Sequence, residues 1–262
     1  MTVSPSHRLA AALTLSALAF ATAGCSSSTP KSTAGSGSLS GTILVLDAAS
    51  LTSAFAQLGK DFEAAHPGTH VTFSPGASSA LAQQILAGAP ADVFASASKK
   101  NMTEVTDKGD ASDPTTFANN VAEVAVAPGS ASKVTTLADL AKPGVKVALC
   151  GPAVPCGVLA KSVLDKAKLT VTPATEGTDV KSTLAYVLNG QADAAIVYVT
   201  DVKAAGDKVK GIEIPAAQNA STSYPIAVLK GSKNAALAHA FENYVLSPAG
   251  QATLIAAGFA KP

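Results

Sequence analysis

Hydroxyl groups stand where this chain passes from a strand pattern to a helix pattern. In "LVLDAASLTSAF" (44–55), an apolar run ends, small residues follow, and a helical pattern begins with Ser50 at the expected N-cap. The stretch "SPGASSALAQQI" (74–85) repeats the arrangement with Ser78 and Ser79. The unpaired amides and partial positive charge of a helix N-terminus attract anions, and a serine adds a hydroxyl donor.

Two more helix starts have the same neutral character. They lie near Cys156 in "AVPCGVLAKSVL" (153–164) and near Val180 in "GTDVKSTLAYVL" (177–188). In an α/β sheet, ligands bind beyond the carboxyl ends of the strands, so the four junctions can line one pocket. The pattern predicts a site in which neutral dipoles, rather than charged side chains, hold an anion.

Catalytic patterns are weak. A serine hydrolase needs a nucleophile elbow, and no G-x-S-x-G is present. After the N-terminal segment the only histidines are His66, His70 and His239. His66 and His70 are four residues apart, but the intervening "PG" breaks any helix that would put them on one face. A cysteine nucleophile at Cys156 has no identified base. We therefore expect no enzyme, and keep a serine or cysteine hydrolase as a distant alternative.

Two aspartates occupy similar turns. "LAGAPADVFAS" (86–96) and "LNGQADAAIVY" (188–198) share a helix end, a glycine, an Ala-Asp pair and an apolar strand. We interpret Asp92 and Asp193 as acceptors for backbone N–H groups at strand entry rather than as catalytic residues. The similarity of these two segments suggests two similarly built lobes.

Export is indicated by the first 40 residues. His7 and Arg8 precede an apolar stretch from Leu9 to Ala23 that has the length of a signal peptide, and "TAGC" resembles a lipobox. We predict a signal peptide (1–24), lipidation of Cys25 and a flexible tether (25–40) rich in Ser, Gly and Thr. Thr22 stands where lipoboxes usually have Leu, which leaves an ordinary secretory signal as the alternative. Membrane association is expected through the lipid anchor only.

The remaining cysteines fit an oxidising compartment. Cys150 and Cys156 bracket "GPAVP", and we favour a disulfide between them over two reduced, buried thiols.

Composition excludes nucleic acid as a partner. From Cys25 onward, 18 Lys balance 18 Asp and Glu, the sole Arg of the chain is Arg8, and aromatic residues make up 5 %. A phosphate-backbone binder would carry a basic stripe.

After residue 40, strand and helix patterns alternate, which predicts an α/β architecture with largely parallel sheets. We expect lobe 1 to combine 41–121 with 224–262, lobe 2 to span 122–223, and the two crossings to form a hinge. The expected strands are 42–46, 70–75, 91–97, 121–127, 145–150, 194–199 and 224–230.

A family resemblance adds to this interpretation. In this order, "DAASLTSAFAQLGKDFEAAHPG", "ASSALAQQILAGAPADVFASA", "VPCGVLAKSVL", "ADAAIVYVTDV", "YPIAVLKGSKN" and "GFAKP" resemble the molybdate-binding proteins of ABC importers. The resemblance implies a two-lobed periplasmic-binding-protein fold of type II, each lobe a mostly parallel sheet flanked by helices. It also implies a monomeric, extracytoplasmic lipoprotein that takes molybdate or tungstate, needs no cofactor, and serves a permease and its ATPase.

The same resemblance implies the ligand contacts. They are the hydroxyls of Ser50 and Ser78, with Ser79 as an alternative register, the backbone amides of Cys156 and Val180, and the phenol of Tyr198. The family usually has Ala at the position of Cys156, but a main-chain contact tolerates the change. No residue is expected to ligate a metal cation directly, because molybdenum is bound as its oxyanion. Another tetrahedral oxyanion such as sulfate is the main alternative, and a structural lipoprotein without a ligand is a further one.

Overall fold

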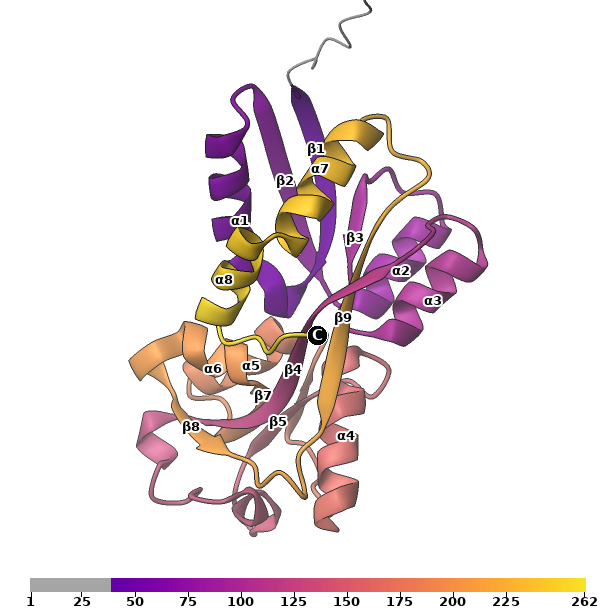
Figure 1. Ribbon diagram of the computed structural model, residues 1–262. Helices are drawn as coiled ribbons and strands as arrows, with labels where there is room; N and C mark the ends of the chain where they lie inside the picture. Colours follow the sequence, from indigo (N-terminus) through magenta and orange to yellow (C-terminus); the bar gives the residue numbers. More distant parts are fainter. Residues whose placement is uncertain (1–38) are drawn as a thin grey trace, which may run out of the picture. The chain divides into compact units, whose positions relative to one another are not determined.

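The computed structural model describes residues 39–262 (Figure 1). The predicted signal peptide, the lipidation site Cys25 and the tether up to residue 38 lie outside the described residues. Of the residues assigned to the tether, Leu39 packs against a hydrophobic cluster and the Ser40 carbonyl accepts a hydrogen bond from Asn234. Within 39–262, every helix is too short or too polar to cross a membrane.

Nine strands make up the sheet, in the order β2-β1-β3-β9-β4-β7-β5-β6, with β8 paired to β4. They are β1 (Gly41–Ala48), β2 (Thr69–Gly76), β3 (Val93–Ala95), β4 (Thr115–Val126), β5 (Val147–Cys150), β6 (Thr175–Gly177), β7 (Ala194–Tyr198), β8 (Lys210–Glu213) and β9 (Ser221–Val228). All seven predicted strands are present. Strands β6 and β8, of three and four residues, were not predicted, since such short segments give no clear alternation.

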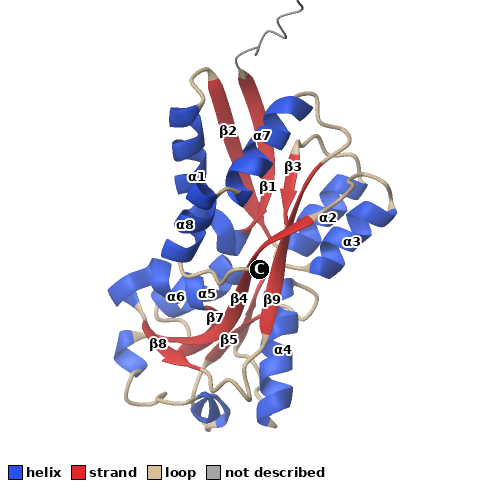
Figure 2. Cartoon of the chain, in the orientation of Figure 1, coloured by secondary structure: helices blue, strands red, loops and turns tan. Residues whose placement is uncertain are grey.

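Helices cover the sheet, as Figure 2 shows. They are α1 (Thr52–Ala65), α2 (Ser78–Leu86), α3 (Lys99–Asp107), α4 (Pro155–Ala167), α5 (Val180–Leu188), α6 (Val199–Ala205), α7 (Ala235–Leu246) and α8 (Pro248–Ala256), with short 3₁₀ turns η1 (Ala49–Leu51), η2 (Pro128–Ser130), η3 (Leu137–Ala141) and η4 (Gly206–Lys208). The α/β prediction is confirmed. Gly88, with φ +82°, ends α2 as expected, since glycine adopts this conformation without strain.

The two halves of the sheet repeat one plan. β1 pairs in parallel with β2 and β3, and β3 pairs antiparallel with β9. In the other half, β5 pairs in parallel with β6 and β7, and β7 pairs antiparallel with β4. The Asp92 carboxylate accepts the Leu44 N–H at 2.8 Å, and Asp193 accepts the Lys146 N–H at 2.8 Å. Both aspartates therefore join neighbouring strand segments, as predicted from their turns.

Strand β4 belongs to both halves. Its residues 115–121 pair with β9, and its residues 122–126 pair with β7. Figure 1 shows β4 and β9 crossing the middle of the molecule. The expected crossings lie on these two strands. The lobe boundaries themselves stay a prediction, because residues 39–262 form a single unit of contacts.

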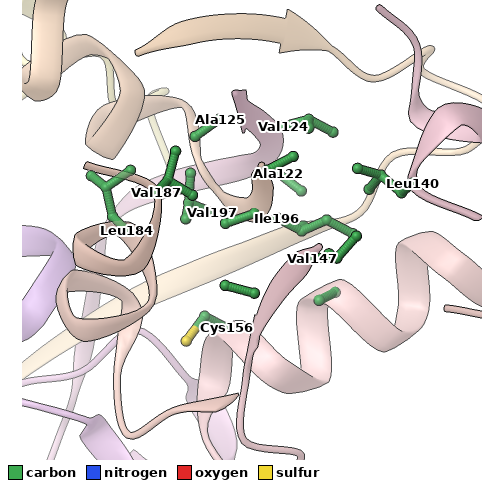
Figure 3. Packing of buried hydrophobic residues seen from close by; sticks show 14 of the residues in the cluster. Ala122, Val124, Ala125, Leu140, Val147, Cys156, Leu184, Val187, Ile196 and Val197 are labelled. Carbon is green, nitrogen blue, oxygen red and sulfur yellow. The ribbon is translucent and has the colours of Figure 1, made fainter. Parts of the chain in front are cut away.

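Separate hydrophobic clusters stabilise the two halves. One packs Ile43, Val45 and Phe55 with Phe241, and another packs strands β4, β5 and β7 against α4 and α5 (Figure 3). On β1, Ile43 and Val45 face the first cluster, while Leu44 and Leu46 face a third cluster under α2 and α3. Because both faces of β1 are covered, its sequence is a continuous apolar run.

Candidate functional site: a cavity lined by neutral donors

All five residues that the sequence analysis assigned to the ligand line one small cavity of about 20 Å³. Its walls are Ala48, Ala49, Ser50, Gly76, Ala77, Ser78, Ala97, Val154, Pro155, Cys156, Asp179, Val180 and Tyr198. These residues follow or end β1, β2, β3, β5, β6 and β7, so the carboxyl ends of three parallel strands in each half converge. The size suits one small guest, since a cavity of about 10–15 Å³ already admits a water molecule.

Ser50 differs from its predicted role as an N-cap. It lies inside η1, whose N-cap is Ala48, while Leu51 is the N-cap of α1. Ser50 is 6 % exposed, and its Oγ lies 2.9 Å from the Tyr224 hydroxyl. The chain makes a 3₁₀ turn before α1, which directs this side chain toward Tyr224 instead of toward its own helix. The prediction of capping is therefore wrong, and the prediction that Ser50 lines the pocket agrees with the geometry.

Ser78 is the first residue of α2 and is 1 % exposed. Its Oγ accepts the Ala97 N–H at 2.9 Å, so its own hydroxyl hydrogen remains available for donation. Ser79 is half-buried and is absent from the cavity wall. Between the two registers left open by the sequence, the cavity selects Ser78.

Cys156 and Val180 offer backbone amides. Cys156 lies in the first turn of α4, whose N-cap Val154 provides no side-chain acceptor, and Val180 begins α5. Neither amide donates to another described residue. Because the first turn of a helix has no intrahelical acceptors, both N–H groups remain for a guest.

A disulfide joins Cys150, at the end of β5, to Cys156, and the Cα atoms are 5.7 Å apart. The bridge was favoured from the sequence. It closes the turn between β5 and α4, and thus limits how far the Cys156 amide can move.

Tyr198 ends β7 and is 1 % exposed. Its hydroxyl makes no hydrogen bond to any described residue. Burial raises the pKa of the phenol well above its ordinary value of 10.0, so the group stays a protonated donor. An orphaned hydroxyl in a buried wall costs free energy, and a partner from outside the chain would remove that cost.

Two carboxylates lie at or near the cavity, one in its wall and one behind it. Asp179 lines the wall, but its Oδ1 accepts the Ser182 N–H at 2.8 Å and so caps α5. Asp201 is fully buried behind Tyr198, accepts the Tyr198 N–H at 3.2 Å and lies 3.3 Å from the Lys181 ammonium. Burial raises the pKa of Asp201 to about 6, and Lys181 opposes the shift. Across residues 39–262, no three His, Cys, Asp or Glu side chains are grouped to hold a metal ion.

Sequence reasoning missed a polar network behind Ser50. Asn120, on β4, donates to Thr200 at 2.8 Å and to Tyr224 at 3.4 Å. Asp47, three residues before Ser50, is fully buried, and neither carboxyl oxygen has a hydrogen-bond partner among the described residues. The polar pair Asn119–Asn120 at a predicted strand crossing was the available signal for the first feature. Asp47 could have been noticed as an acidic residue within an apolar strand.

Comparisons with known proteins agree with this architecture. Residues 43–260 match the family model described as "Bacterial extracellular solute-binding protein". The "Molybdate-binding protein ModA" of Mycobacterium tuberculosis is 41 % identical over 240 residues, covering 91 % of this chain and 92 % of that protein. A protein of the same name from Haemophilus influenzae is 33 % identical, covering 83 % of this chain and 89 % of that protein.

A solved structure shows the same fold. The periplasmic molybdate-binding protein of Azotobacter vinelandii superposes with a TM-score of 0.76 at 24 % identity, covering 84 % of this chain and 99 % of that chain. The predicted type II periplasmic-binding-protein fold is thus confirmed. The relatives and the family model are named for solute binding rather than for catalysis. The chain belongs to the family of bacterial extracellular solute-binding proteins.

Proposed function

We propose that this protein captures molybdate outside the cytoplasmic membrane and delivers it to the permease of an ABC importer. Relatives with 41 % and 33 % identity carry the name of molybdate-binding proteins, and they cover most of the chain. Tungstate, which nearly matches molybdate in size and charge, is proposed as a second ligand.

The observation that carries the proposal is the Tyr198 hydroxyl, buried in the cavity wall without a partner. Four further donors stand around the same space, namely the hydroxyls of Ser50 and Ser78 and the amides of Cys156 and Val180. A hydrogen bond to a charged acceptor contributes about 1.5–3 kcal/mol. Five such bonds, less the costs of desolvation and closure, suffice for micromolar affinity or better, which requires about 8 kcal/mol.

The five proposed contacts, used as donors, favour a fully deprotonated anion. Hydrogen phosphate carries a proton that would need one of these groups, or the Asp179 carboxylate, to act as an acceptor instead. Sulfate is fully deprotonated, so charge cannot reject it and only the spacing of the donors can. Molybdate, the larger ion, would reach donors that sulfate cannot contact all at once.

Closure of two lobes supports retention of the anion. The five contact residues are at most 6 % exposed, so a guest could leave only after the walls part. We propose that 41–121 with 224–262 move as one lobe and 122–223 as the other, with β4 and β9 as the hinge. The permease would recognise the closed form, and its ATPase would drive import.

Titration calorimetry of the purified protein with molybdate, tungstate, sulfate and hydrogen phosphate tests the proposal. We expect molybdate and tungstate to bind with sub-micromolar Kd, sulfate far more weakly, and hydrogen phosphate not at all. Tight sulfate binding with no molybdate signal would show that the ligand is sulfate instead of molybdate. If none of the four anions binds, the proposed transport function is overturned.

Membrane attachment is a separate part of the proposal. The sequence supports a lipid anchor on Cys25, with the predicted tether (25–40) as spacer and a monomeric binding unit. In cells, Cys25→Ser should move the protein from the membrane fraction to the surrounding fluid. A variant that stays membrane-bound would contradict the anchor without affecting the binding site.

A further inference from the structure

A chain of side-chain hydrogen bonds reaches the cavity from behind Ser50. Asn120 Nδ2 lies 3.4 Å from the Tyr224 hydroxyl, and that hydroxyl lies 2.9 Å from Ser50 Oγ. Tyr224 belongs to β9 and is completely buried, with its ring edge-on to those of Phe259 and Tyr198. Tyr224 is absent from the cavity wall, so it can act on the guest only through wall residues, namely Ser50 by a hydrogen bond and Tyr198 by ring packing.

The donor-to-acceptor direction of this series of hydrogen bonds is fixed at Asn120, the residue farthest from the cavity. The Asn120 Oδ1 accepts the Val121 N–H at 3.0 Å, which assigns the other terminal atom as the NH₂ group. An NH₂ group can only donate, and its two hydrogens serve Thr200 Oγ1 at 2.8 Å and the Tyr224 oxygen. The Tyr224 oxygen is therefore an acceptor toward Asn120.

The direction then propagates to Ser50. A phenol has one hydrogen, and burial raises the pKa of Tyr224 far above its ordinary value, so that hydrogen is retained. The Asn120 NH₂ cannot accept that hydrogen, and the Tyr198 hydroxyl makes no hydrogen bond of acceptable geometry, so Ser50 Oγ is the one acceptor that the described contacts offer it. The Ser50 oxygen becomes an acceptor toward Tyr224, and its own hydrogen is free to face the cavity.

We propose that Tyr224 is a positioning residue for anion binding, which acts with Asn120 to turn the hydroxyl hydrogen of Ser50 toward the guest. This inference rests on the proposed function. The Ser78 oxygen also accepts a hydrogen bond, and its hydrogen is thereby left for the guest, but a single backbone N–H, from Ala97, is enough. Ser50 needs two side chains, Asn120 from β4 and Tyr224 from β9. Without Tyr224, the Ser50 hydroxyl is free to rotate and present a lone pair to the anion, which repels it.

A double-mutant cycle on the full chain tests the proposal, with molybdate affinity measured by calorimetry. Tyr224→Phe removes one hydroxyl and keeps the ring; we expect affinity to fall about tenfold. In the Ser50→Ala background, the same change should cost less than twofold, because the group that Tyr224 positions is gone. Tyr244→Phe is the matched control, since the Tyr244 ring packs on Phe62 away from the cavity.

A purely structural role for Tyr224 predicts a different result. Loss of packing or of lobe geometry would lower affinity equally in both backgrounds, and such additivity overturns the inference. If wild type fails to bind molybdate, the proposed function itself fails, which is a distinguishable outcome.

A second cycle covers the case in which Tyr224→Phe is poorly folded. Asn120→Asp replaces the donating NH₂ by an accepting oxygen, so Tyr224 turns toward residue 120 and Ser50 must donate to Tyr224. We expect the loss of affinity to be at least fivefold greater in the wild-type background than in Ser50→Ala. Equal losses, as expected if only the added charge matters, overturn the inference.

Discussion

The hydroxyl oxygens of Ser50 and Tyr224 lie 2.9 Å apart although 174 positions separate them in the chain. The contact joins the 3₁₀ turn after β1 to strand β9, and it does so in a fully buried environment. Ser50 lines the cavity while Tyr224 does not, so this contact connects the cavity wall to a buried side chain outside it.

Substitution of the two serines should weaken molybdate binding. Ser50→Ala and Ser78→Ala each remove a hydroxyl donor to a charged acceptor, and we expect a loss of about 1.5–3 kcal/mol in binding free energy. Ser79→Ala is the matched control beside Ser78, because Ser79 does not line the cavity. Calorimetry measures all three. Unchanged affinity in both the Ser50 and the Ser78 variants would show that molybdate does not bind at this cavity.

Tyr198→Phe should have opposite effects on binding and on the stability of the unliganded protein. Loss of the donor should cost about 1–3 kcal/mol of molybdate affinity. Without ligand, the melting temperature should stay level or rise, since a buried hydroxyl without a partner has been removed. Tyr186→Phe, on α5 and outside the cavity wall, should change neither quantity. A lower melting temperature with unaltered affinity would assign Tyr198 to the core alone.

Removal of the disulfide should affect stability more than binding. The Cys150→Ala/Cys156→Ala variant loses a short covalent loop, for which the chain-entropy relation gives about 2 kcal/mol of unfolding free energy. Affinity should change little, because the proposed contact is the main-chain N–H of residue 156. Urea unfolding with and without reductant measures the first effect, and reductant should destabilise wild type only. Abolished binding in a folded variant would show that the sulfur itself matters.

Ionisation of Asp47 should make the protein less stable as pH rises. Burial raises its pKa from 3.8 to about 7. Near pH 4 and below, both the folded and the unfolded chain keep the proton and no penalty arises. Between pH 4 and 7 the unfolded chain releases the proton while the folded one retains it, so the unfolding free energy falls by about 4 kcal/mol.

The test of this titration is Asp47→Asn, which keeps the shape and cannot ionise. Its unfolding free energy should match wild type near pH 4 and exceed it near pH 8. Asp201, whose pKa burial raises to about 6, leaves a residual slope in the same direction. Asp107→Asn, an exposed substitution on α3, is the control. Parallel pH profiles for wild type and Asp47→Asn would refute the titration of this group.

Much of the fold and site could be predicted because it rests on local pattern. Apolar runs with β-branched residues predicted the strands, and the Ala-Asp turns predicted that Asp92 and Asp193 would bond to neighbouring strand backbone. Ser78 opens its helix as expected. Five residues lie between Cys150 and Cys156, and such a short loop brings the two sulfurs together without knowledge of the rest of the fold.

Local pattern was misleading where a residue's partner is distant. Ser50 has the sequence context of an N-cap, yet the 3₁₀ turn and the hydroxyl of Tyr224 give it another partner. Asn120 and Thr200, 80 positions apart, meet because β4 passes from one half of the sheet to the other. No local window contains such a pair.

By itself, the sequence determined the alternation of strands and helices, the neutral donors at the helix starts, and the near absence of cationic side chains around them. These follow from residue type and spacing, since hydrophobic periodicity and free first-turn amides act within a few residues. Only the tertiary structure decided that six strand ends meet in one cavity, that Ser78 rather than Ser79 lines it, and that Ser50 has Tyr224 as its hydrogen-bond partner. Those features depend on contacts between segments far apart in the chain. The physical reason is that burial exists only after the two halves of the sheet have packed, and burial is what leaves Tyr198 without a partner and raises the pKa of Asp47.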